Sequence, residues 1–106
     1  MPMATTFKSK DWTFELAQVV EGRVALVHAV DEFRCNTTLA IDEESIEVMS
    51  YQRAWAEADM RLGEDLLDAF SEREIRGVLL NLAVNFKMNF GVVPIPWLID
   101  AVDEIL

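Results

Sequence analysis

Between residues 11 and 41 the chain alternates between apolar and polar positions, which is the pattern of half-buried β-strands. One side of the first run holds Trp12, Phe14, Leu16 and Val20. Glu21-Gly22 follows, and a second alternating run, RVALVHAV, begins at once. Two such runs separated by two residues that end in Gly predict a β-hairpin.

The second run leads into further strands. One of its sides carries Val24, Leu26, His28 and Val30. Asp31-Glu32 is predicted to be a second two-residue turn, because a third alternating run, FRCNTTLAI, follows it. After the polar residues DEES, residues 46–50 (IEVMS) are a candidate fourth strand. The pattern therefore predicts an antiparallel β-meander of three strands, or of four.

The apolar period changes from two residues to 3.6 after Tyr51. Residues 51–70 are predicted to form an amphipathic helix with Trp55 at the centre of its apolar face. Ser71 and Glu74 have the spacing of a capping box, and Gly91 is the residue type that ends helices, so a second helix is expected between them. That helix is apolar around most of its circumference, along a face that runs from Ile75 to Phe90.

A third helix is predicted after Pro96, which suits a first helical turn. Its expected inward residues are Leu98, Ala101, Val102 and Ile105, and its expected outward residues are Asp100, Asp103 and Glu104. The predicted fold class is α+β: a β-meander followed by three helices packed on one face. We expect residues 1–10 to be a flexible N-terminus and residues 11–106 to form a single domain, which the 52% hydrophobic content supports.

Negative charge is concentrated in one stretch of the chain. The net charge is −10, and residues 42–68 carry nine carboxylates against two arginines, or −7 of that total. Clustered like charge opposes folding, so a cluster with this little compensation suggests a use as well as a solvated surface. The residues predicted to contact a partner are Glu43, Glu44, Glu47, Glu57, Glu64, Asp65 and Asp68.

Few residues suggest catalysis or metal binding. If Asp31-Glu32 were a two-residue turn, His28 would face Cys35 across the hairpin, and a thiol needs such a base to act as a nucleophile. Nothing in the sequence adds an oxyanion site to this pair, so we expect a non-enzymatic protein in which His28 is a structural residue. The chain lacks the Cys and His clusters of zinc sites and the ligand spacing of calcium loops, and no metal or cofactor is expected.

The leading hypothesis is a small acidic protein that blocks a basic, nucleic-acid-handling partner, as toxin-immunity proteins and phage inhibitors of bacterial defence do, with carboxylates that mimic nucleic acid. The alternative is a secretion-type chaperone or assembly subunit, expected to be a homodimer, that binds through apolar surface, either VVPIPWLI (residues 92–99) or a sheet edge. The favoured interpretation of residues 92–99 themselves, however, is that Trp97 and Ile99 close the open end of the core. A single Cys and an N-terminus without an apolar run favour the cytoplasm, and the acidity disfavours direct contact with nucleic acid or membranes.

Overall fold

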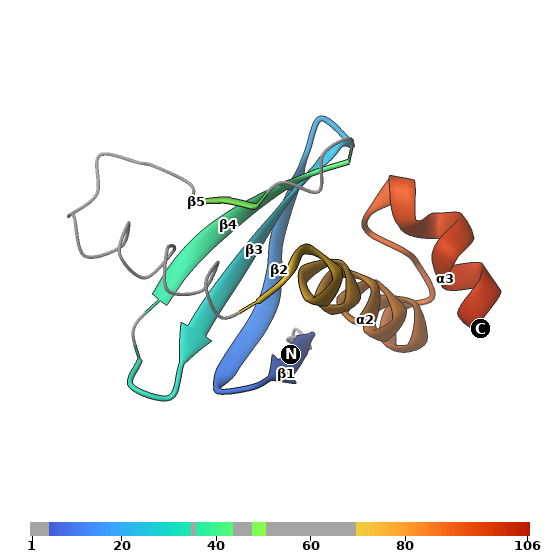
Figure 1. The fold of residues 1–106 in the computed structure, drawn as a ribbon. Helices are drawn as coiled ribbons and strands as arrows, with labels where there is room; N and C mark the ends of the chain where they lie inside the picture. The colour runs from blue at the N-terminus through green and yellow to red at the C-terminus, as the bar shows by residue number, and fades with distance from the viewer. Residues whose placement is uncertain (1–4, 35, 44–47, 51–69) are drawn as a thin grey trace.

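A computed structural model describes residues 5–34, 36–43, 48–50 and 70–106. An antiparallel sheet and helices make an α+β fold, as predicted (Figure 1). The sheet is a five-stranded meander in which spatial order follows chain order. Its strands are β1 (Thr6–Ser9), β2 (Trp12–Val20), β3 (Val24–Asp31), β4 (Asn36–Asp42) and β5 (Val48–Ser50). The candidate strand at 46–50 is thus present as β5, which pairs with β4.

The N-terminal segment differs from expectation. Residues 1–10 were predicted to be flexible, but β1 pairs along its whole length with β2, from Thr6 opposite Glu15 to Ser9 opposite Trp12. Lys10 makes the tight turn possible by adopting a positive φ of 54°. Phe7 packs against the core, which anchors the strand. The sequence pattern did not reveal a strand at Thr6–Ser9, because four residues are too few to show a period.

The hairpin between β2 and β3 confirms the turn predicted at Glu21-Gly22. Glu21 and Gly22 have φ values of 55° and 71°, the left-handed conformation that the central residues of a type I′ turn require. The amide of Arg23 donates to the carbonyl of Val20 at 3.2 Å and closes the turn.

A β-bulge at Ala17 interrupts the alternation of β2. Leu16 pairs with Val27 and Gln18 with Leu26, so Ala17 has no opposite residue. The extra residue exchanges the two sides of the strand beyond it. Val19 packs against the core, whereas Val20, expected on the same side as Leu16, pairs with Val24 on the other side.

The connection between β3 and β4 is longer than the two-residue turn predicted at Asp31-Glu32. The strands end at Asp31 and resume at Asn36. An Asp31 carboxylate oxygen accepts a hydrogen bond from the Phe33 amide at 3.0 Å, and the Asp31 carbonyl accepts one from the Arg34 amide at 3.1 Å. Because these local bonds lengthen the loop, the pairing of β3 with β4 differs from the pairing that a two-residue turn would give.

Helix α2 (Glu72–Phe90) has both of the predicted ends. The Ser71 hydroxyl accepts from the Glu74 amide at 3.2 Å, and Glu74 accepts from the Ser71 amide at 3.1 Å, which completes the capping box. Gly91 is left-handed, with φ of 76°, and its amide bonds to the Lys87 carbonyl. The helix buries Ile75, Val78, Leu79, Leu82 and Ala83. Phe90 was expected on this buried face but is 43% exposed, because the helix continues past the core.

The chain enters α2 through a contact between distant segments. Phe70 is buried, and its ring meets the Phe14 ring edge to face at 5.5 Å between centroids. The Lys10 ammonium lies 4.4 Å from the centroid of the Phe70 ring and 3.1 Å from a Glu74 carboxylate oxygen. The turn between β1 and β2 is therefore attached to the first turn of α2.

A single 3₁₀ turn, η1 (Pro96–Leu98), leads into α3 (Ile99–Ile105), with Pro96 in the first turn as predicted. Leu98 and Val102 are buried, but Ile105, expected inward, is 56% exposed because α3 touches the domain along a narrow seam. Within the described ranges there are two α-helices, and both lie on one side of the sheet (Figure 1). Of the helix predicted at 51–70, residues 51–69 lie outside the described residues, and Phe70 is not in a helix.

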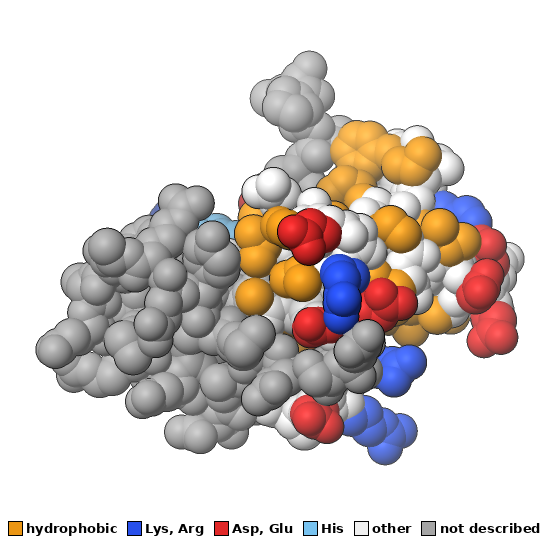
Figure 2. Space-filling model, turned by 90° about the horizontal axis from the view of Figure 1, so that it is seen from above, with side chains coloured by type: hydrophobic (Ala, Val, Ile, Leu, Met, Phe, Trp, Pro, Cys, Tyr) orange, Lys and Arg blue, Asp and Glu red, His pale blue; other side chains and the backbone are white. Residues whose placement is uncertain are grey.

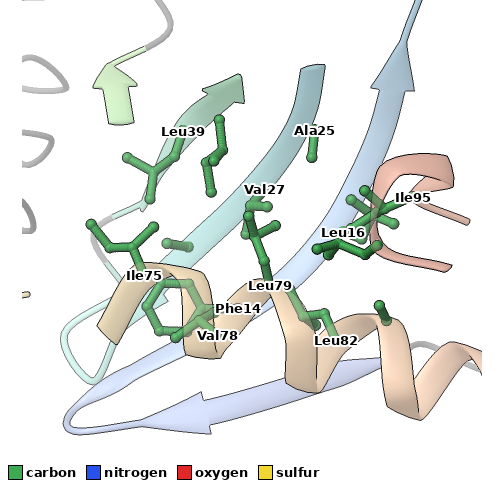
Figure 3. Close-up of a cluster of buried hydrophobic side chains, with 14 of the residues drawn as sticks. Phe14, Leu16, Ala25, Val27, Leu39, Ile75, Val78, Leu79, Leu82 and Ile95 are labelled. Atoms are coloured by element: carbon green, nitrogen blue, oxygen red, sulfur yellow. The ribbon is translucent and has the colours of Figure 1, made fainter. Parts of the chain in front are cut away.

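The core fills the space between the sheet and α2. Side chains from β2, β3 and β4 point towards α2, with Ile95 of the following loop completing the cluster (Figure 3). The largest fully buried side chains are Leu39, Ile41, Leu79, Leu82, Ile95, Val27 and Val102. Neither α2 nor α3 has the length and hydropathy of a membrane span.

Candidate protein-interaction surface

The acidic stretch predicted to contact a partner begins at the end of β4. Glu43 is exposed, and its amide bonds to the Arg23 carbonyl at 2.9 Å, which places it beside the β2–β3 turn (Figure 1, top). Glu21 is exposed in that same turn. Asp42 lies 3.7 Å from the Arg23 guanidinium, because pairing of β3 with β4 brings the two residues together. The other predicted contact residues, Glu44, Glu47, Glu57, Glu64, Asp65 and Asp68, lie outside the described residues.

A second group of carboxylates lies on α3. Asp100, Asp103 and Glu104 are exposed, as predicted. Asp103 forms an ion pair with Lys87 of the last turn of α2 and so joins the two helices. Asp100 and Glu104 have no ion-pair partner in the part of the chain that the structure describes.

Some of residues 92–99 close the core, and others are exposed apolar residues. Ile95 and Leu98 are fully buried or nearly so and close the core, while Val92 and Ile99 are exposed. Trp97 is partly buried against the core. Figure 2 shows apolar side chains over the described part of the face that is seen from above, interspersed with acidic and basic side chains, and a group of acidic side chains at the right-hand edge. The sequence did not predict exposed apolar side chains on α3, because Ile105 was expected to point inward.

The register of β3 and β4 removes the arrangement that would have paired His28 with Cys35. Thr38 lies opposite His28, and the His28 Nδ1 is 3.5 Å from the Thr38 hydroxyl. His28 alternates with Val27 and Ala29, which are buried in the core, so it lies on the other side of the sheet, where it is only partly buried. Cys35 lies outside the described residues.

Among the carboxylates of the described residues, that of Glu74 has a shifted pKa. The Ser71 amide, followed by the Lys10 ammonium, holds the pKa of Glu74 below its ordinary value. Both contacts favour the ionised form. Since the partners of Glu74 belong to the cap and to the β1–β2 turn, this shift reports on the fold and does not mark a reactive site.

The described residues contain no group of three or more His, Cys, Asp or Glu side chains that could hold a metal ion. Comparison of the chain with protein-family models, with curated proteins and with solved structures gave no match.

Proposed function

We propose that this chain is a small acidic binding protein, not an enzyme, that attaches to a basic protein which handles nucleic acid and blocks it. The observation that carries the proposal is the excess of carboxylates. The described residues hold 12 acidic and 7 basic residues, a net charge of −5, and the rest of the chain contributes the other −5. The negative charge is thus spread over the described domain as well as the stretch at 42–68.

Carboxylates at this density suit a groove lined with Lys and Arg. Such a groove binds phosphates, and its counterions are released when an anionic ligand arrives. A protein of net charge −10 approaches it under long-range attraction, which accelerates association at low salt. A bound protein then excludes nucleic acid from the groove, which is inhibition by mimicry. Toxin-immunity proteins and phage inhibitors of bacterial defence are examples of this class of function, and a cytoplasmic location fits it.

The test is a competition experiment. A partner is captured on the immobilised protein at about 50 mM salt, identified by mass, and assayed for binding to a DNA or RNA duplex with increasing amounts of the protein. The partner should lose its nucleic acid, and its affinity for the protein should fall steeply with salt. A partner that retains its nucleic acid while bound to the protein would refute the proposal.

Two variants with three charges removed address the predicted residues. One is E43Q/E44Q/E47Q, and the other is E64Q/D65N/D68N. Each should slow association by roughly tenfold or more at low salt and flatten the salt dependence. The matched control is E15Q/E32Q/E72Q, which removes three exposed charges elsewhere on the domain. Equal slowing by the control would mean that net charge alone acts, and that the predicted residues form no particular contact.

A further inference from the structure

The central strand β3 is apolar on the side that faces away from α2. Ala25, Val27 and Ala29 are buried in the core, so the residues that alternate with them lie on the other side of the sheet. Those residues are Val24, Leu26, His28 and Val30. An antiparallel sheet with one face in water usually carries polar residues on that face. Three apolar residues in four outward positions indicate instead that β3 is covered on both faces.

Strand pairing joins these residues to apolar neighbours on β2 and β4. Val24 pairs with Val20, and Leu26 pairs with Ala40. Directly paired residues of antiparallel strands point to the same face with Cβ atoms about 4.5–5.5 Å apart, and alternate residues of one strand are about 7 Å apart. We call Val20, Val24, Leu26, Val30 and Ala40 the outer apolar face.

The helices of the described ranges do not lie on the outer apolar face, because α2 and α3 are on the opposite side of the sheet (Figure 1). Ala40 is 7% exposed, and the other four side chains of the face keep part of their surface accessible. The part of the chain that the structure describes thus leaves apolar surface on β3 that a second molecule can bury.

A lysine and a glutamate lie on the same side of the sheet as the outer apolar face. Phe7 and Phe14 pair with each other and pack in or against the core. Lys8 and Glu15 follow them along β1 and β2 and therefore point to the outer side, where both are exposed. The two are diagonal neighbours, about 7–8 Å apart, and their charges balance.

The remaining charge on this side of the described strands is also balanced. Asp42 points outward because it pairs with Val24, and the Arg23 guanidinium lies 3.7 Å from it. The outer side thus has two positive and two negative residues. The described residues include 12 acidic and 7 basic ones, which leaves 10 acidic and 5 basic residues elsewhere. The whole described net charge of −5 therefore lies off this side.

This distribution of charge indicates what covers the outer apolar face. Two copies of a chain with net charge −10 repel each other over most of their surface, but not where two neutral, apolar faces meet. A basic partner gains no electrostatic attraction at a neutral face. A second copy brings an identical apolar face, and two identical faces cover each other across a twofold axis.

We propose that the outer apolar face is the interface of a homodimer, in which β3 of one copy packs against β3 of a second copy and the two sheets lie face to face. Sheets packed in this way are about 10 Å apart, and side chains of the two facing surfaces interdigitate. Helices α2 and α3 remain on the outside of the dimer. The inference does not depend on the proposed function, because the described excess of carboxylates lies off this interface.

The mass of the protein in solution tests the dimer. Sedimentation equilibrium of the full chain between about 5 and about 500 µM should show the mass rising from 12.1 kDa towards twice that value. The variant V24T/L26T/V30T keeps a residue type that suits strands but removes apolar contact, so it should raise the dissociation constant at least tenfold. A wild-type mass of 12.1 kDa at every concentration would overturn the proposal.

A matched control removes apolar side chains that are more exposed but lie elsewhere. Phe33, Met88 and Ile105 are 76%, 69% and 56% exposed. The variant F33S/M88S/I105S should leave the dissociation constant of the dimer unchanged within about twofold. Equal loss of the dimer in this control would mean that exposed apolar residues in general cause the association, and would overturn the assignment to the outer apolar face.

The contact can also be mapped on the wild type, so that the test does not depend on the fold of a variant. In a mixture of ¹³C-labelled and unlabelled chains, intermolecular nuclear Overhauser effects should connect the methyl groups of Val24, Leu26 and Val30 in the two copies. Intermolecular contacts centred on α2 or α3 would overturn the proposal.

Salt separates the dimer from the proposed function. Higher salt screens the repulsion between two acidic chains, so the dimer should become tighter between about 50 and 500 mM salt, whereas binding of a basic partner should weaken. A dimer that weakens with salt would show that charges hold it together and would overturn this inference alone. A dimer that tightens with salt, in a chain that does not displace nucleic acid from a basic partner, would support the inference and refute the proposed function.

Discussion

The contact between Lys10 and Phe70 offers a sharp test of how this domain is assembled. Phe70→Leu removes a buried ring that meets Phe14 edge to face and lies beneath the Lys10 ammonium. An aromatic pair contributes about 0.5–1.5 kcal/mol beyond its buried area, and a cation over a ring contributes about 0.5–1 kcal/mol at exposed sites. The substitution should therefore lower the free energy of unfolding by roughly 1–2.5 kcal/mol.

A double-mutant cycle isolates the cation–π contact. Lys10→Met keeps the aliphatic stem and removes the charge, which also abolishes the ion pair with Glu74. The Lys10 side chain is 45% exposed, so solvent screens its charge and the coupling to Phe70 should lie near 0.5 kcal/mol. Contacts of Lys10 that do not depend on Phe70 cancel in the cycle.

Urea unfolding of the wild type, the two single variants and the double variant measures this coupling. Lys8→Met is the matched control, because Lys8 is an exposed lysine of the same hairpin. Its coupling to Phe70→Leu should be zero within error. A Lys10–Phe70 coupling indistinguishable from that of Lys8, with unchanged dependence on urea concentration, would show that the turn between β1 and β2 is not attached to α2 through this ring.

Three further predictions concern α2. Ser71→Ala removes the N-cap and should lower the free energy of unfolding by about 0.5–2 kcal/mol in urea titrations; no change would mean that the capping box is unimportant. Because the pKa of Glu74 is lowered on folding, its stabilising effect is present above the ordinary carboxyl pKa and is lost as pH falls through the folded pKa. Melting temperatures of wild type and Glu74→Gln should therefore differ most between about pH 6 and 7 and converge in acid, and a gap that widens in acid would contradict this sign. Leu79→Ala should lower the free energy of unfolding by about 2–5 kcal/mol, because Leu79 is fully buried. Met88→Ala should change it by less than about 0.5 kcal/mol, because Met88 is exposed. Similar losses of stability in the two variants would show that the buried face of α2 has been assigned incorrectly.

The features that could be predicted from the sequence are those that neighbouring residues determine. The cap at Ser71, the left-handed Gly91, Pro96 in a first turn and the turn at Glu21-Gly22 all depend on bonds within a few positions. Each leaves a residue type at a fixed spacing, which a single sequence reveals. The α+β class follows from the change of period, which is also local.

The features that could not be predicted depend on contacts between distant residues. Strand β1 is stabilised by pairing with β2 and by Phe7 against the core, and four residues carry no period of their own. The β3–β4 loop is set by bonds to Asp31 that shift the partner of His28 to Thr38. A pattern of apolar positions shows neither the pairing of so short a strand nor the length of a loop.

The candidate surface was predictable to a limited extent. The outward acids of α3 follow from helical period, and they are exposed as expected. The exposure of Ile105 and Phe90 does not follow, because period alone says which side of a helix is apolar but not how much of that side a small domain can cover. Of the seven predicted contact residues, Glu43 is the one that the structure places, at the sheet end beside Arg23.

The bulge in β2 has a consequence for how this gene can change. Ala17 is the extra residue, exposed and without an opposite partner. A deletion of that codon leaves a regular strand in which Trp12, Phe14, Leu16 and Val19 alternate inward without interruption. Deletion of Thr13 or Glu15 instead turns core side chains outward. Position 17 is therefore where β2 can lose a residue and keep its inner face, at the expense of the bend that the bulge introduces.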